Sequence, residues 1–189
     1  MPVKNRGALA LVLHSHMPYV EGFGTWPFGE EWLWEAVATV YLPLLEIVRG
    51  HAVTVGLTPV LCDQLEALEG DAGERFLSFI RDTRSAVHEM DSRELEERGE
   101  GVLAAEVRRA AGDYRRAEQR FRRDLLRAFR DTPRIELWTS SATHAVLPLV
   151  ATEPGRELQV SAGAGSHERR FDTWSGGFWL PECAYEPGL

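Results

Sequence analysis

The sequence has little lysine and little cysteine, and each shortage excludes a class of protein. Lysine occurs once, at Lys4, and arginine supplies the rest of the 21 basic residues; 29 acidic residues outweigh them, giving a formal net charge of −8. Nonspecific binding to duplex DNA or to an anionic membrane needs net positive surface, so the charge argues against nucleic acid and membranes as partners. The two cysteines, Cys62 and Cys183, lie far apart without a CxxC pair, which excludes a disulfide scaffold and a zinc ribbon.

Long hydrophobic runs are also missing. The apolar stretch after the polar N-terminus covers only residues 8–13. That is too short for the core of a signal peptide and far too short to span a bilayer. We therefore expect a protein of the reducing cytoplasm without a membrane anchor.

The chain contains enough apolar sequence for one folded domain. Its 189 residues are 44% hydrophobic and 26% charged, a composition that can bury a core and differs from that of disordered chains. Short apolar segments bounded by polar or turn residues predict four strands. These segments are residues 8–13, 52–57, 135–140 and 177–180. The first is continuously apolar, as in a strand buried on both faces of a parallel sheet.

Helices are predicted between these strands. Residues 30–48 carry a broad apolar face at helical spacing, and Pro43 is expected to kink or divide that helix. Residues 62–131 are rich in Glu, Arg, Leu and Ala and predict a long helical insertion with an ion-paired, solvated face. We expect a short helix over 142–150, interrupted by a proline, and a loop over 153–165.

The alternation of strands and helices indicates an α/β fold with a parallel sheet and helical crossovers. Polar and titratable side chains follow each predicted strand where it ends. They are His14 and His16 after the first strand, Thr58 and Asp63 after the second, Thr139, Ser140 and His144 after the third, and Glu182 after the fourth. Barrels and open sheets of this class place active sites at these carboxyl ends. We therefore predict one site there.

His14 and His16 are separated by one residue at the end of a strand, so their side chains leave the same face. Three interpretations stay open for the pair. The imidazoles are ligands of a metal ion, as in hydrolases whose first barrel strand ends in HxH, or they hydrogen-bond a substrate hydroxyl or catalytic carboxylate. In the third, both are structural.

Glu182 follows an apolar strand directly and lies beside Trp179 and Tyr185 in the sequence. Carboxylates perform acid–base or covalent chemistry on sugars, and aromatic rings stack on apolar sugar faces. The pattern predicts a nucleophile or an acid that faces a sugar ring. The alternative is a surface glutamate after a strand.

Two further kinds of side chain are candidates for the same cleft. His144 is expected in the first turn of a helix after a strand, where it either faces the cleft or packs structurally. Trp26, together with Trp32 and Trp34, offers either a surface on which a sugar stacks or ordinary core packing.

Several segments, taken together and in this order, resemble conserved regions of glycoside hydrolase family 57, and within it the α-1,4-glucan branching enzymes. The segments are Leu13-His-Ser-His-Met-Pro-Tyr19, Gly29-Glu-Glu-Trp-Leu-Trp-Glu-Ala36, Thr139-Ser-Ser-Ala-Thr-His-Ala-Val-Leu-Pro-Leu149 and Gly177-Phe-Trp-Leu-Pro-Glu-Cys-Ala-Tyr185. Each motif alone is modestly specific, but their order and spacing across the whole chain make the resemblance strong.

The resemblance implies that residues 1–189 are the N-terminal part of an incomplete seven-stranded (β/α) barrel. It implies a retaining enzyme that acts on α-glucans such as amylose or glycogen and uses no cofactor and no metal. Glu182 matches the nucleophile, and His14, His16 and His144 match active-site histidines. The family's acid/base is an aspartate of a later region. We therefore expect a fragment, or one piece of a split enzyme whose partner is the missing C-terminal half.

Two other functions stay open at this stage. One is a metal-dependent hydrolase or deacetylase that uses His14 and His16 as ligands. The other is a catalytically inactive remnant that binds glucan without turnover. Within the resemblance itself, branching, hydrolysis and 4-α-glucan transfer are not separated by the sequence.

Overall fold

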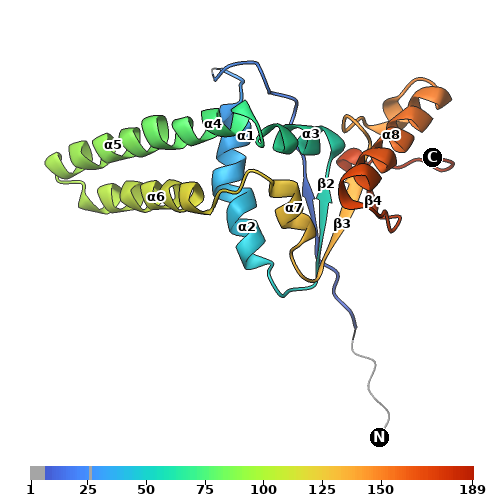
Figure 1. Ribbon diagram of the computed structural model, residues 1–189, viewed down its shortest axis with the longest axis horizontal. Helices are drawn as coiled ribbons and strands as arrows, with labels where there is room; N and C mark the ends of the chain where they lie inside the picture. The colour runs from blue at the N-terminus through green and yellow to red at the C-terminus, as the bar shows by residue number, and fades with distance from the viewer. Residues whose placement is uncertain (1–6, 26) are drawn as a thin grey trace, which may run out of the picture. The chain divides into compact units, whose positions relative to one another are not determined.

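The computed structural model describes residues 7–25 and 27–189, which divide into two compact units. The first unit comprises residues 7–16, 48–59 and 132–189, and the second comprises residues 17–47 and 60–131. The first contains the whole sheet and the second is helical (Figure 1).

The sheet of the first unit has four parallel strands in chain order. They are β1 (Val12–Ser15), β2 (Val53–Leu57), β3 (Ile135–Ser140) and β4 (Phe178–Trp179). Each strand is hydrogen-bonded to the next along the chain, as in a barrel, whereas in a doubly wound sheet the strand order reverses. The expected fold, a part of a (β/α) barrel, is therefore confirmed.

The first strand differs from the sequence prediction. The apolar run was expected to be buried on both faces, but β1 begins only at Val12 and is half-buried. Leu9 is 95% exposed and Leu11 is 52% exposed. The physical reason is position: within the described residues β1 ends the sheet and pairs with β2 alone, so it is covered less than β2.

Residues 153–165 were expected to form a loop, and this expectation is wrong. They belong to α8 (Glu153–Phe171), a helix of 19 residues. The Thr152 side chain accepts a hydrogen bond from the N–H of Gly155, and a proline occupies the first turn, so the helix start is well capped. Gly163 packs against the carbonyl oxygen of Ser140, where a Cβ would clash. The packing of α8 on β3 thus outweighs the low helix propensity of its glycines.

The helix expected over 142–150 is also absent. Only a 3₁₀ turn forms there, Leu147–Leu149, and the residues before it are irregular. His144 has φ of 58°, in the left-handed region, so it lies in a loop and not in the first turn of a helix. This backbone geometry excludes a right-handed helix through the residue.

The second unit begins with a continuous helical segment, as predicted for residues 30–48. It consists of α1 (Glu31–Ala36), the π-helical η1 (Val37–Tyr41) and α2 (Leu42–Ile47). The N–H of Leu42 bonds the carbonyl of Val37, five residues back. Pro43 has no N–H to donate, and the wider π turn directly before it accommodates its ring. The proline therefore introduces a π-helical stretch in place of a break.

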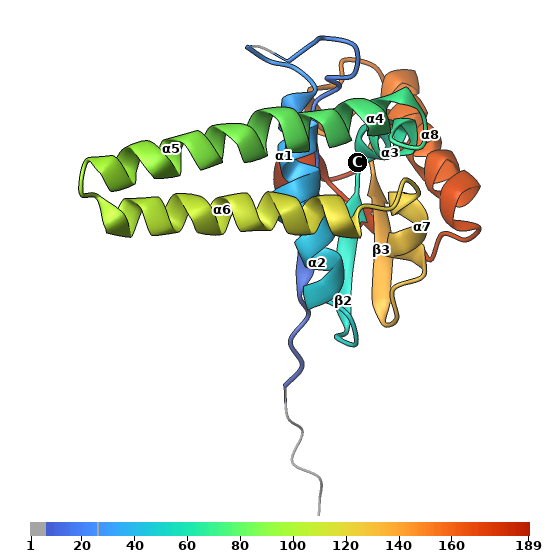
Figure 2. The same cartoon turned by 60° about the vertical axis from the view of Figure 1, so that its left-hand side comes forward.

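The remaining helices of the second unit confirm the helical texture predicted after β2. They are α3 (Pro59–Ala67), α4 (Asp71–Ser78), the π-helical η2 (Phe79–Ser85), α5 (Ala86–Glu97), α6 (Gly101–Arg120) and α7 (Leu125–Arg130). Helices α5 and α6 lie side by side as an antiparallel hairpin (Figure 2). Phe76, Ile80, Leu125 and Phe129 are almost fully buried and form much of the core of this unit. That residues 62–131 are an insertion stays a prediction.

None of the helices among the described residues is both long enough and apolar enough to cross a membrane.

Candidate active site

Four aromatic rings stack in a column at the carboxyl ends of the strands of the first unit. The His16 ring lies on the His144 ring at 3.9 Å between centroids, and the His14 ring lies between His144 at 5.1 Å and Trp179 at 4.7 Å. The interplanar angles are between 10° and 18°. The structure therefore brings together all three histidines that the sequence predicted as site residues.

Strand pairing positions the first two histidines. His14 is in β1 and faces Gly56 of β2 in register. A Cβ at Gly56 would lie only 3.4 Å from Nδ1 of His14, so the glycine leaves just enough room for the imidazole. His16 follows β1, and its Nδ1 lies 3.3 Å from the hydroxyl of the buried Thr58 at the end of β2.

Loop hydrogen bonds hold His144. The backbone N–H of His144 donates to the carbonyl of Ser141 at 3.0 Å, and the Ser141 hydroxyl donates to the carbonyl of Ala145 at 3.0 Å. These bonds enclose the left-handed residue within a tight turn. Nε2 of His144 lies 2.9 Å from Nε2 of His14, a hydrogen bond in which one of the two nitrogens must carry the proton.

Glu182 reaches the column from the end of β4. It lies in a 3₁₀ turn, Pro181–Cys183, and has φ of 54°. Its Oε1 lies 3.9 Å from Nδ1 of His144, and the side chain is 73% exposed. Two residues before the turn, the carbonyl of Trp179 accepts a hydrogen bond from the hydroxyl of Ser140 at 2.8 Å, which ties the end of β4 to β3.

The histidines are electrostatically unlike free imidazoles. Burial, together with repulsion from neighbouring histidines, lowers the pKa of His14 and of His16 from 6.5 to about 4. Burial also lowers the pKa of His144, although the Glu182 carboxylate opposes this shift. All three rings are therefore neutral near pH 7, and they act as hydrogen-bonding groups in place of cations.

The metal-site alternative gains no support from this arrangement. Among residues 7–25 and 27–189 no group of three or more His, Cys, Asp or Glu side chains is placed to hold a metal ion. His16 instead stacks on the His144 ring, and His14 is hydrogen-bonded to His144 through Nε2. Such stacking does not converge ligand atoms on one point.

The aromatic residues predicted to bind substrate differ in their position and exposure. Trp179 joins the column and covers one face of His14. Tyr185 follows the Glu182 turn and is 68% exposed. Trp26 lies outside the described residues. Of the other two tryptophans, Trp34 is buried in the core of the helical unit and Trp32 is 41% exposed.

Sequence reasoning missed Gly56 and Ser141, which support the site, and it placed Ser140 at a strand end without predicting its supporting role. Gly56 provides space for His14, and the Ser140 and Ser141 hydroxyls hold the two loops that carry Glu182 and His144. A glycine inside an otherwise β-branched strand is a usable signal for a close approach. Hydroxyls at a strand end carry no comparable pattern.

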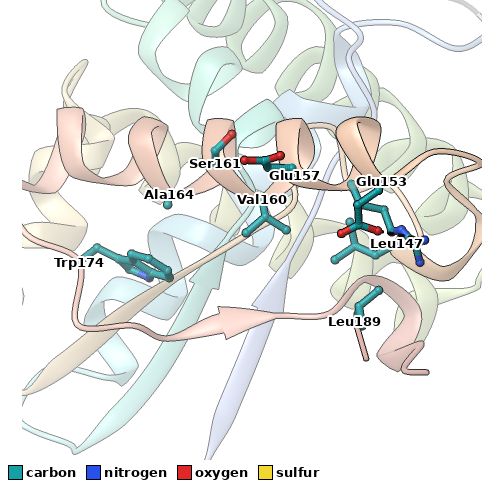
Figure 3. A pocket seen from close by; sticks show the side chains of 9 residues that line it. Leu147, Glu153, Glu157, Val160, Ser161, Ala164, Trp174 and Leu189 are labelled. Carbon is teal, nitrogen blue, oxygen red and sulfur yellow. Dashed lines mark ion pairs between the residues drawn. The ribbon is translucent and has the colours of Figure 1, made fainter. Parts of the chain in front are cut away.

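A pocket of about 370 Å³ lies along α8, and none of the column residues or Glu182 lines it. Figure 3 shows Val160 and Ala164 of the helix with Trp174, Leu147 and Leu189 around it, and polar residues of α8 at its rim. The indole N–H of Trp174 donates to the carbonyl of Gly177 at 2.9 Å, which fixes that ring. The pocket is thus separate from the candidate site.

Successive parallel strands with titratable groups at their carboxyl ends define the barrel class of α/β enzymes. The model of glycosyl hydrolase family 57 matches residues 10–189. The chain belongs to this family.

Several relatives are similar to the chain over nearly all of its length. A 1,4-alpha-glucan branching enzyme of Thermococcus kodakarensis is 35% identical and aligns with 96% of the chain. A probable 1,4-alpha-glucan branching enzyme of Mycobacterium tuberculosis is 32% identical over 97%. The chain spans only 28% and 39% of the lengths of these two proteins.

Solved structures agree with the fold. The branching enzyme of Pyrococcus horikoshii superposes with a TM-score of 0.84 and 33% identity, covering 96% of this chain and 36% of that one. The alpha-amylase AmyC of Thermotoga maritima superposes with a TM-score of 0.78 and 26% identity, covering 97% of this chain and 37% of that one.

Proposed function

We propose that the chain carries the nucleophile side of the active site of a retaining enzyme that acts on α-glucans. Among such enzymes we favour 1,4-α-glucan branching, because the curated relatives at 32–35% identity bear that name. The similarity to an alpha-amylase supports α-glucan as the substrate class even if the final acceptor differs.

One observation carries the proposal: the carboxylate of Glu182 lies at the same end of the sheet as the histidine column, with Oε1 3.9 Å from Nδ1 of His144. The carboxylate is exposed, so a sugar can reach it, whereas the three histidines are half-buried. A structural glutamate has no need of three neutral imidazoles behind it.

The chemistry follows from the carboxylate. A carboxylate oxygen of Glu182 attacks the anomeric carbon of the glucan, the glycosidic C–O bond breaks, and its electron pair stays on the leaving oxygen. A second carboxyl group protonates that oxygen. By the family resemblance this acid is an aspartate of a later region. The glycosyl ester then passes to a sugar hydroxyl with overall retention.

The exposed Tyr185 ring and the edge of the Trp179 ring flank the carboxylate in sequence and supply apolar surface for the sugar faces. Neutral imidazoles donate or accept hydrogen bonds from hydroxyl groups without placing a positive charge beside the developing oxocarbenium ion.

The test uses a substrate that needs no acid. In a maltosyl fluoride with a second fluorine on the reacting ring, fluoride leaves without protonation and the covalent sugar is long-lived. The chain is incubated with this reagent, digested with protease and analysed by mass spectrometry. We expect the maltosyl mass on the peptide that contains Glu182.

Two variants make the assignment specific. Glu182→Gln should remove the label, because an amide is a far weaker nucleophile than a carboxylate. Glu186→Gln is the matched control: this neighbouring carboxylate pairs with Arg156 at 2.6 Å and should not affect labelling. A label on any other residue, or no label on the unmodified chain, refutes Glu182 as the nucleophile.

A further inference from the structure

The two ring nitrogens of His144 face two different residues, one within hydrogen-bond distance and the other further away. Nε2 lies 2.9 Å from Nε2 of His14, and Nδ1 lies 3.9 Å from Oε1 of Glu182. A line of polar atoms therefore runs from His14 through His144 to Glu182.

The direction of the hydrogen bonds along this line can be assigned from the surroundings of His14. Its Nδ1 is buried and has no hydrogen-bond partner, because it faces the Cα of Gly56. A neutral imidazole carries one N–H and one lone pair, and a buried donor without an acceptor is disfavoured. The proton of His14 therefore belongs on Nε2, which donates to Nε2 of His144.

The same assignment of protons agrees with the position of Glu182. Because Nε2 of His144 accepts, its own proton lies on Nδ1, which faces the Glu182 carboxylate. The opposite order would leave a buried N–H on His14 without an acceptor and would direct a lone pair of His144 at a carboxylate. Both ends thus favour one tautomer for each ring.

We propose that His14 is a positioning residue: by donating to Nε2 of His144 it keeps a proton on Nδ1 of that ring, so that this N–H faces the Glu182 carboxylate at 3.9 Å and orients it for attack. This inference rests on the proposed role of Glu182 as nucleophile. His14 itself does not contact the carboxylate, so its effect passes through His144.

The packing around the line supports this role. Trp179 stacks on His14 and His16 stacks on His144, and these contacts restrict the rotation of both rings. His16 is the other titratable group that faces His144, and its lowered pKa keeps it neutral alongside the others. His14 and His144 thus form a neutral donor chain toward the carboxylate, and the neutral His16 ring packs against it.

The first test reads the tautomers directly. Long-range ¹H–¹⁵N NMR of the ¹⁵N-histidine-labelled chain near pH 7 should show His14 protonated on Nε2 and His144 on Nδ1. In His14→Leu, which keeps bulk but loses the donor, His144 should shift toward the Nε2–H form. In His14→Gln, whose amide nitrogen can replace Nε2, it should stay on Nδ1.

The second test reads the effect on the carboxylate. We expect His14→Leu to slow labelling of Glu182 by the fluorinated sugar about tenfold or more, while His14→Gln stays within about threefold of the unmodified chain. Glu182→Gln made alone should move the His144 Nδ1–H resonance. The same substitution made together with His14→Leu should not move it. This last comparison needs no turnover.

The outcomes separate this inference from the proposed function. If the unmodified chain is not labelled at Glu182, the nucleophile assignment fails, and the NMR comparison still decides whether His14 orders the ring that faces the carboxylate. If His144 carries its proton on Nε2 in the unmodified chain, or if His14→Leu is labelled at the unmodified rate, the positioning role is wrong. Retained melting temperatures of both variants exclude unfolding as the cause.

Discussion

Gly163 of α8 lies directly against the carbonyl oxygen of Ser140 at the end of β3. A Cβ at position 163 would fall well inside van der Waals contact with that oxygen. The helix and the strand that leads into the site therefore touch backbone to backbone, and the glycine is what permits this contact.

Gly163→Ala should consequently destabilise the first unit, because the helix must move away from β3. We expect a loss of about 1–3 kcal/mol in the free energy of unfolding, as for other overpacked sites. Gly165→Ala, on the exposed side of the same helix with nothing within 4 Å, should gain up to about 1 kcal/mol from helix propensity. Chemical denaturation measures both. Equal effects at the two positions would refute the backbone contact.

Ser140→Ala tests the tie between β3 and β4. Its hydroxyl donates to the carbonyl of Trp179 at 2.8 Å, three residues before Glu182. Removing the bond should cost about 1 kcal/mol in unfolding free energy and slow covalent labelling of Glu182. Ser161→Ala, which removes an exposed hydroxyl on α8, should change neither measurement. If Ser140→Ala leaves the labelling rate unchanged, this bond does not position the turn.

Tyr114→Phe tests a buried contact in the helical unit. The Tyr114 hydroxyl donates to Oε2 of Glu35, which also pairs with Arg84, and burial together with this bond raises the pKa of the tyrosine. Loss of a bond to a charged acceptor should cost about 1.5–3 kcal/mol. Tyr19→Phe is the control, because its bond to Glu21 is exposed and should be worth little. Urea titrations should therefore show a larger loss of unfolding free energy for Tyr114→Phe than for Tyr19→Phe.

The histidine column predicts how stability depends on pH. The pKa of His14 and of His16 is about 4 in the folded chain and about 6.5 when unfolded, and burial lowers the pKa of His144 and of His167 as well. Between these values the unfolded chain binds protons that the folded chain does not. The free energy of unfolding should therefore be highest above pH 6.5 and fall as the pH drops toward 4.

Denaturation at a series of pH values measures that slope, and a variant identifies its source. The double variant His14→Gln, His16→Gln should flatten the curve between pH 6.5 and 4. His51→Gln, which alters an exposed histidine, should not. A slope unaffected by the double variant would place its origin elsewhere in the chain.

Much of the framework could be predicted from the sequence, and the reasons are local. β2 and β3 are short segments rich in apolar residues between turn residues, and their ends place Thr58 and Ser140 where the pattern indicated. His14, His16 and Glu182 could be placed together because parallel strands bring their carboxyl ends to one edge.

The rest depended on contacts that no local pattern shows. The glycines of α8 predicted a loop, but Gly163 is required by the approach of the Ser140 carbonyl, and tertiary packing overrode propensity. His144 adopts a left-handed backbone that only its loop hydrogen bonds explain. Trp179 also stacks on His14, a contact that the spacing of residues in the sequence does not show.

The role of Glu182 as nucleophile is tested most directly by finding which atom of the chain becomes bonded to sugar. After incubation with the fluorinated maltosyl fluoride, peptide mapping should find one maltosyl group, attached to Glu182, in the unmodified chain and in Glu186→Gln, and none in Glu182→Gln. A sugar attached elsewhere, or an unmodified chain that stays unlabelled, would contradict the claim that this carboxylate is the nucleophile in front of the three histidines.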